Sequence, residues 1–421
     1  MAEGPVAEAA ARTPCALVLM GGGARTAYQA GVLHEVARLL RHRDPLRAAH
    51  LARNAPLERP PASPFPFGIL LGTSAGAINA AFLASRAHQG SQALVQLARF
   101  WRHVHSEQVY SLRTSPWVRW SRIATAYSLV TEARRQGSFL DSAPLAGTLT
   151  RLIDFERIGA NLDSGRLQAL GVTASSYATG EHWTFFQQAA HTVPQGEIAP
   201  ASWWRPGRRI VQQRLTAQHL LASSALPFLM PAVALSPPAQ DEVSPASYFG
   251  DGSMRQIAPL SAALYQGAGR ILVIGVGQPQ RPQRAAAATR TGPPSLGAVA
   301  GHAMGSVFHD ALQADVEQAQ RINRALARLP QAQREQWPYR PVQIVLMQPS
   351  QSLDALAERH VHALPAATRH TLQGLGAFHG SGAALASYML FEPAFVKALM
   401  ALGADDARAR QDELLALLSP A

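Results

Sequence analysis

A serine between two glycines is the strongest chemical feature of this sequence. The run from Gly72 to Gly76 reads G-T-S-A-G, with Ser74 at its centre, after an apolar stretch and before a run of small residues. On a strand-to-helix turn of this kind the hydroxyl is exposed for attack on a carbonyl carbon. The flanking glycines remove Cβ atoms that would collide in so tight a turn. Ser74 is therefore the candidate nucleophile, with an ordinary serine in a glycine-rich turn as the alternative.

Three successive glycines form a second feature. Gly21, Gly22 and Gly23 follow the first apolar run and precede Arg25. Glycine N–H groups at a helix start can bind an anion, such as a dinucleotide pyrophosphate, a nucleotide phosphate or the oxyanion of acyl transfer. The dinucleotide fingerprint requires glycine where this chain has Thr26, and no Gly-Lys-Ser/Thr follows for a phosphate loop. Elimination favours an oxyanion hole at these three glycines.

An aspartate between two glycines is the third feature. Asp251 lies between Gly250 and Gly252, directly after two aromatic residues. A serine nucleophile needs a base, and a carboxylate at a tight turn could supply it. Asp-Gly is a common turn dipeptide, so Asp251 is a candidate base only because the other two motifs are also present.

In combination, these motifs resemble those of the patatin-like phospholipase family. That family carries a glycine-rich oxyanion loop, then a G-x-S-x-G serine, then an Asp-Gly motif, matched here by 21–25, 72–76 and 251–252. Residues 139–145 and 222–227 also resemble family segments. The resemblance covers roughly residues 15–277. It departs from the family at Thr26, where glycine is usual, and at Ser253, where Gly or Ala is usual; neither change removes a reacting group.

The resemblance implies a lipid acyl hydrolase with a Ser–Asp dyad. Ser74 would attack the acyl ester of a phospholipid or related substrate, and Asp251 would take its proton with no histidine between them. The loop of Gly21, Gly22 and Gly23, helped by Arg25, would hold the oxyanion. Gly72, Gly76 and Gly252 would support the turns, and neither metal nor cofactor is implied. The implied fold is a three-layer α/β arrangement with a mostly parallel central sheet.

One other catalytic mechanism and two other functions stay open. A Ser–Asp–His triad would fit the chain order if His302 or His309 supplied the histidine. An acyltransferase or thioesterase could use the same dyad. The same fold could also serve as a lipid-binding or assembly module with weak or no catalysis.

Short apolar runs alternate with helical patterns, which favours an α/β fold with a largely parallel sheet. An amphipathic helical pattern runs over 381–407. We expect strands at 16–20, 67–71, 167–173, 182–186, 271–276 and 342–347. The expected organisation is a flexible tail (1–14), a catalytic domain (15–278, with an insertion at 41–66), a linker (279–299) and a mostly helical C-terminal extension (300–421).

Composition and charge limit the possible metal sites, membrane segments and cellular location of the protein. The 421 residues carry a formal charge of +11, and Cys15 is the one cysteine, which excludes a disulfide scaffold or a multi-cysteine metal site. The sequence contains no run of about 18 apolar residues, so we expect no transmembrane helix. Residues 1–14 lack the basic and then apolar pattern of a signal peptide. Tryptophans among arginines over 100–135 suit transient contact with an anionic membrane, or helix packing in the core with a solvated arginine face. We expect a cytoplasmic protein, peripheral at the inner membrane face, without nucleic-acid binding; a homodimer stays open.

Overall fold

The computed structural model describes residues 13–43, 63–112, 138–189, 206–236, 247–277, 296–366, 368–369 and 383–418. Side chains are described for all of these except residues 43, 296–310 and 383. The predicted insertion at 41–66 and the Trp- and Arg-rich stretch at 100–135 lie partly outside the described residues.

In the described parts of the chain, a central sheet of nine strands runs in the order β11-β10-β1-β2-β5-β6-β7, with β9 paired to β5 and β8 paired to β9. The five strands from β11 to β5 are parallel to one another. β6, β8 and β9 introduce antiparallel pairs. The strands are β1 (Cys15–Leu19), β2 (Ile69–Thr73), β5 (Ala169–Ser176), β6 (His182–Gln188), β7 (Arg208–Gln212), β8 (Val233–Leu235), β9 (Ser247–Asp251), β10 (Arg270–Ile274) and β11 (Gln343–Met347).

Helices follow most strands, as the alternating sequence pattern predicted. A separate two-stranded pair joins β3 (Ser111–Leu112) and β4 (Leu140–Asp141). The α-helices are α2 (Ala27–Arg43), α4 (Ala75–Arg86), α5 (Gln92–Trp101), α7 (Ala143–Leu152), α8 (Phe155–Asp163), α9 (Ala217–Ser223), α10 (Ser261–Tyr265), α11 (Leu296–Ala327), α12 (Gln331–Gln336), α13 (Leu353–Glu358), α15 (Ala383–Met389), α16 (Pro393–Ala409) and α17 (Gln411–Leu418). Short 3-10 turns include η1 (Gly23–Thr26) and η6 (Gly252–Arg255).

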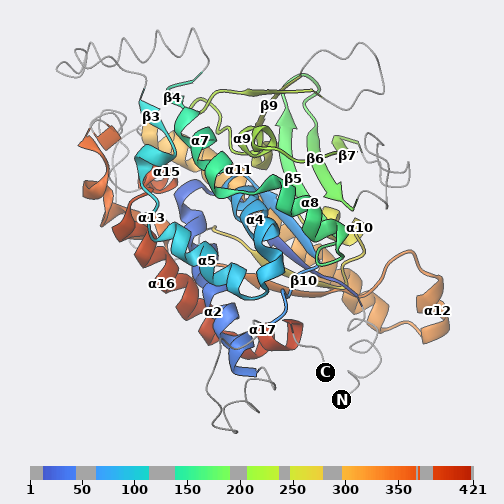
Figure 1. The fold of residues 1–421 in the computed structure, drawn as a ribbon. Coiled ribbons are helices and arrows are strands. Elements are labelled where there is room, and N and C mark those ends of the chain that lie inside the picture. Colours follow the sequence, from blue (N-terminus) through green and yellow to red (C-terminus); the bar gives the residue numbers. More distant parts are fainter. Residues whose placement is uncertain are drawn as a thin grey trace, which may run out of the picture.

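The two faces of the sheet bury different helices. Side chains alternate along each strand, so Leu17 and Leu19 of β1 join one core while Val18 joins the other. The larger core holds α2, α4, α5 and α8, which cover the near face in Figure 1. The smaller core holds α10 and α11 on the opposite face. This is the three-layer α/β arrangement, with a mostly parallel sheet, that the sequence predicted.

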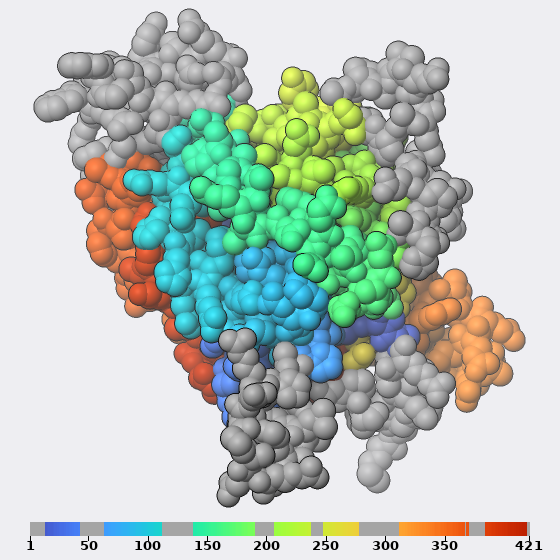
Figure 2. All heavy atoms as spheres, viewed as in Figure 1, coloured from blue at the N-terminus to red at the C-terminus, as the bar shows by residue number. Residues whose placement is uncertain are grey.

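The C-terminal helices lie directly on this domain. α16 crosses α2 with almost no space between the backbones, because a Cβ at Gly31 would lie 2.1 Å from the carbonyl oxygen of Met400. A Cβ at Gly403 would likewise lie 2.3 Å from the carbonyl oxygen of Tyr28. In Figure 2 the red and orange C-terminal residues lie against the cyan ones of the N-terminal half. β11 also extends the same sheet, beside β10.

The amphipathic pattern over 381–407 contains two helices rather than one. α15 ends at Met389 and α16 begins at Pro393. Proline lacks an N–H and disfavours the helical conformation in the residue before it, so it fits the first turn of a new helix. Glu392 is accordingly extended, with φ −122° and ψ 140°. The break lets α15 lie against the N-terminal glycine loop while α16 lies along α2.

Candidate active site

Ser74 lies on a strained turn between β2 and α4. Its backbone has φ 55° and ψ −132°, a positive φ that side-chain-bearing residues rarely adopt. The residue is 2% exposed, and its N–H donates to the Ser223 hydroxyl at 2.8 Å. Ser74 is also the N-cap residue of α4 and directly follows the C-terminal residue of β2, which is the geometry of a nucleophile elbow.

The two flanking glycines are required by close backbone approaches. A Cβ at Gly72 would lie 2.4 Å from Cα of Ala77, across the turn itself. A Cβ at Gly76 would lie 2.3 Å from the carbonyl oxygen of Leu19 on the neighbouring strand β1. The G-x-S-x-G spacing is thus a steric condition for bringing α4 down onto β1 and β2.

Strand β5 brings Asp251 to Ser74. On one edge of β5, Thr73 pairs with Thr173, and the next residue, Ala174, pairs with Asp251. β2 and β9 therefore meet end to end along the same edge, and each strand has its C-terminal residue at the junction. The chain leaves β2 at Thr73 and enters Ser74, so the serine and the aspartate meet beside consecutive residues of β5.

A tight turn fixes the carboxyl group of Asp251. Its Oδ1 accepts the N–H of Ser253 at 2.9 Å and caps the 3-10 turn η6. A Cβ at Gly252 would lie 2.4 Å from the carbonyl oxygen of Thr173, so glycine is needed there. The Ser253 departure therefore leaves the backbone donor in place. Oδ2 is buried and has no hydrogen-bond partner among the described residues.

Burial changes the proton affinity of this carboxyl group. Asp251 is fully buried, and the loss of hydration raises its pKa from 3.8 to about 6. The nearby Ser74 hydroxyl acts in the other direction and lowers the pKa, as do the N–H and hydroxyl of Ser253. A carboxylate with a pKa near 6 is ionised at neutral pH and still basic enough to accept a proton from a serine.

The glycine loop ends β1 next to the elbow. Gly23 has φ 55°, and a Cβ there would lie 2.2 Å from the carbonyl oxygen of Tyr388. The loop is closed by Arg25 N–H donating to the Gly22 carbonyl at 3.1 Å and by the Thr26 hydroxyl donating to the Gly23 carbonyl at 2.7 Å. Thr26 therefore supports the loop in place of the glycine usual in the family.

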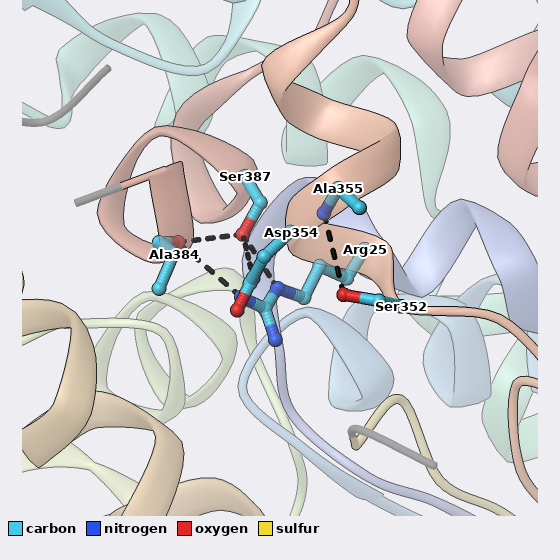
Figure 3. Close-up of polar contacts among 6 residues, drawn as sticks. All are labelled: Arg25, Ser352, Asp354, Ala355, Ala384 and Ser387. Carbon is cyan, nitrogen blue, oxygen red and sulfur yellow. Dashed lines mark hydrogen bonds and ion pairs between the residues drawn. The ribbon is translucent and has the colours of Figure 1, made fainter. Parts of the chain in front are cut away.

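The Arg25 side chain has its partners on α13 and α15. Its guanidinium is buried and contacts Asp354, Ser387 and the carbonyl of Ala384 (Figure 3). Within the described residues, the side-chain hydrogen bonds of Arg25 go to these three residues and to neither Ser74 nor Asp251. The sequence placed Arg25 among the oxyanion donors, and the structure gives its side chain partners on α13 and α15.

Ser74 opens into a largely apolar pocket with a volume of about 740 Å³, part of it open to solvent. The two further segments that carried the family resemblance both contribute to its wall. The wall is formed by Gly23, Ser74, Ala75, Ile78, Phe100, Trp101, Val104, Val109, Tyr110, Leu140, Leu145, Thr148, Leu149, Leu152, Ser224, Leu226, Leu229, Met230, Tyr388, Met389 and Phe391.

Sequence reasoning assigned no role in the site to three of the residues that shape it. Ser223 accepts the Ser74 N–H, and Tyr388 and Met389 line the pocket from the C-terminal extension. Ser223 lies in a segment that resembled the family, so its neighbourhood carried a signal. Tyr388 and Met389 lie on the apolar face of the amphipathic pattern over 381–407. That pattern left the core, a lipid channel and a second subunit open as partners, because it does not show what the helix packs against.

No histidine lines the pocket within the described residues. His302 and His309, the candidates for a triad, lie on α11 where side chains are outside the description. The triad therefore stays an untested alternative. In the described parts of the chain, no three His, Cys, Asp or Glu side chains gather closely enough to hold a metal ion.

Comparison with known proteins places the chain in a family. No curated protein matches the sequence. Among solved structures, the human GIVD cytosolic phospholipase A2 is similar, with a TM-score of 0.41 and 12% identity. The match covers 97% of this chain and 61% of that protein, so this chain spans less than two thirds of its length. A family model described as patatin-like phospholipase matches residues 17–264, more than half of the chain. The chain therefore belongs to the patatin-like phospholipase family.

Proposed function

We propose that this protein hydrolyses acyl esters of lipids through a Ser74–Asp251 dyad. The observation that carries the proposal is the meeting of the strained serine and a buried aspartate with an unpartnered oxygen, at the end of an apolar pocket. The pocket wall suits a hydrocarbon chain, because burying apolar surface is favourable by roughly 25 cal/mol per Å². The ester group would then lie at the serine.

In the acylation step, the Ser74 Oγ attacks the ester carbonyl carbon and its proton passes to Oδ2 of Asp251. The carbonyl oxygen becomes an oxyanion. The N–H groups of Gly21, Gly22 and Gly23 donate to no backbone carbonyl among the described turns and loops, so they are free to bind it. The tetrahedral intermediate collapses, the bond to the alcohol breaks, and the departing oxygen takes the proton from Asp251.

In the deacylation step, water attacks the acyl-enzyme carbonyl carbon and gives a proton to Asp251. The second tetrahedral intermediate collapses, and the bond to Ser74 Oγ breaks. The proton returns to Ser74, and the fatty acid leaves. The net reaction is ester plus water to carboxylic acid plus alcohol, and it follows the general scheme of nucleophilic catalysis.

Assays of wild type beside Ser74→Ala and Asp251→Ala test this proposal. We expect both substitutions to lower turnover by at least about 10⁴-fold, because each removes a reacting group. A fluorophosphonate probe should label wild type and not Ser74→Ala. His302→Ala and His309→Ala serve as matched controls and should keep near-wild-type turnover. Loss of turnover in either histidine variant would support a triad instead.

Substrate comparison separates the remaining functions. A long-chain phospholipid, an acyl thioester and a short ester should be assayed side by side, with an alcohol acceptor added in a parallel reaction. Release of free fatty acid from phospholipid supports the proposal. Preferential thioester cleavage or transfer to the alcohol would indicate a thioesterase or an acyltransferase. Folded protein that neither labels nor hydrolyses any ester would favour a lipid-binding module.

The net charge of +11 gains a meaning if the substrate is a lipid, because a basic protein is attracted to an anionic membrane. No helix of the described residues is both long and apolar enough to cross a membrane. Because this net charge is positive, we propose that the protein binds anionic lipid transiently. Binding to anionic vesicles should weaken as salt rises, because exposed charges are screened over about 10 Å at 0.1 M salt. Binding that ignores both salt and lipid charge would contradict this.

A further inference from the structure

A buried arginine links the glycine loop to the C-terminal helices. The Arg25 side chain is 1% exposed. Its Nε donates to the Ser387 hydroxyl at 2.7 Å, and one terminal nitrogen donates to the carbonyl of Ala384 at 3.3 Å and pairs with Asp354 (Figure 3). The guanidinium also stacks over the ring of Tyr388, 4.0 Å from its centroid.

All of these partners lie 329 to 363 residues further along the chain, on α13 and α15. They also lie beyond residue 264, where the family match ends. A buried guanidinium is costly unless a charge and hydrogen-bond acceptors compensate it. The part of the chain that matches the family thus contains a buried charge whose described side-chain partners come from the C-terminal extension.

The same contact reaches the glycine loop and the pocket. Arg25 lies two residues after Gly23 in η1, and its own N–H closes the loop on the Gly22 carbonyl. Gly23 lies so close to the carbonyl of Tyr388 that no side chain fits between them. Tyr388 itself lines the pocket next to Ser74. A displacement of α15 would therefore change both the loop and the pocket wall.

We propose that α13 and α15 form a working part of the active site, in which Asp354 and Ser387 hold Arg25 so that the Gly21–Gly23 loop keeps the shape that binds the oxyanion. Arg25 is then a positioning residue rather than an oxyanion donor. The inference deepens the proposed hydrolase function and rests on it.

Asp354→Asn is the decisive variant, because it keeps Arg25 and removes only the charge of its partner. We expect kcat on a soluble short-chain ester to fall about 10- to 100-fold, since a small misplacement of catalytic groups has effects of this size. KM should stay within about threefold, because the apolar wall is retained. Asp354→Glu should recover part of kcat. Asp405→Asn, which removes a carboxylate paired with Arg408 elsewhere in the extension, should match wild type.

A direct donor role for Arg25 makes a different prediction. It predicts a large loss of kcat in Arg25→Ala and near-wild-type kcat in Asp354→Asn, and that result would overturn the proposal. If Asp354→Asn does not fold, the double variant Arg25→Met/Asp354→Leu replaces it, because removing both charges avoids an unpaired buried ion. That double variant should fold and still show the reduced kcat. Wild-type kcat in the double variant would also overturn the proposal.

Hydrogen exchange separates this proposal from the hydrolase function. Amide exchange in the peptide covering residues 17–26 should be faster in Asp354→Asn than in wild type, and unchanged in Asp405→Asn. If wild type hydrolyses no ester, the proposed function fails, and faster exchange still supports the link between α13, α15 and the loop. Unchanged exchange together with unchanged kcat, or unchanged exchange in an inactive wild type, would overturn it.

Discussion

Two glycine turns lie side by side at the carboxyl ends of β1 and β2, and they are held in different ways. The turn at Ser74 is fixed by the sheet and by its own helix, because Gly72 and Gly76 lie against the backbones of Ala77 and Leu19. The turn at Gly21 to Gly23 is fixed largely from outside, by Tyr388 and by the partners of Arg25. One turn is built by neighbouring strands, and the other depends on the far end of the chain.

The range matched by the family model includes both turns but excludes the residues that hold the second one. Residues 17–264 include the serine, the aspartate and both glycine turns. They do not include Asp354, Ser387 or Tyr388, which hold the second turn. Substitutions at the two turns should therefore separate an effect on the stability of the whole domain from an effect on the site alone.

The largest expected effect comes from Gly76→Ala, compared with Gly23→Ala. In Gly76→Ala the new methyl would lie 2.3 Å from the Leu19 carbonyl of a buried central strand, which cannot move. We expect the free energy of unfolding in urea to fall by about 3 kcal/mol or more. In Gly23→Ala the neighbour is the short helix α15, which can shift. We expect a smaller loss, about 1–3 kcal/mol, with a clear fall in kcat.

Gly147→Ala is the matched control for these two variants. Gly147 lies in α7 with nothing within 4 Å of a new Cβ. We expect its free energy of unfolding to rise by about 0.5–1 kcal/mol, because alanine is more favourable than glycine in the interior of a helix. Equal losses of stability at Gly76 and Gly23, with unchanged kcat at Gly23, would remove the contrast between the turns.

The charge of Asp251 gives the next largest effect. Its pKa is raised to about 6, so the native carboxyl keeps a proton between about pH 4 and pH 6 that the unfolded chain has lost. Native stability therefore falls as pH rises through this window. Asp251→Asn places a neutral side chain where wild type must bury a carboxylate. Its free energy of unfolding at pH 8 should therefore exceed that of wild type by up to about 3 kcal/mol. Thermal unfolding against pH measures the difference, which should vanish below about pH 4.

Catalysis should show the opposite dependence on pH. The base must be ionised, so kcat/KM should rise with pH through about 6 and fall about tenfold per pH unit below it. A profile that stays flat down to pH 4, or a D251N variant less stable than wild type at pH 8, would contradict the assignment of Asp251 as a buried base.

The smallest expected effect tests the strain in the elbow. Ser74→Gly relieves the positive φ and should raise the free energy of unfolding by about 1 kcal/mol while abolishing turnover. Phe228→Gly is its control, because Phe228 has φ 65° and is 77% exposed. That variant should gain similar stability and keep its activity. No gain in either variant would show that the sheet does not impose strain on the elbow.

Much of this protein could be predicted from local patterns. The short apolar runs and the helical periodicities between them predicted the α/β class, and the structure confirms a mostly parallel sheet between helices. The three glycine-containing motifs predicted the family, which the family model confirms. Periodicity failed over 381–407, where Pro393 divides one apparent helix into two. The dyad and the domain boundaries stay predictions.

The sequence by itself determined the order of the motifs, the strands β1, β2, β5, β6, β10 and β11, and the glycines that tight turns require, because these depend on neighbouring residues and on backbone sterics. It did not predict β9, the strand that carries Asp251. Only the tertiary structure decided that Asp251 meets Ser74, since that contact depends on the register of β2 and β9 along β5. It also decided where the Arg25 side chain goes. A guanidinium can reach many acceptors, and the fold alone brings Asp354 and Ser387 to it.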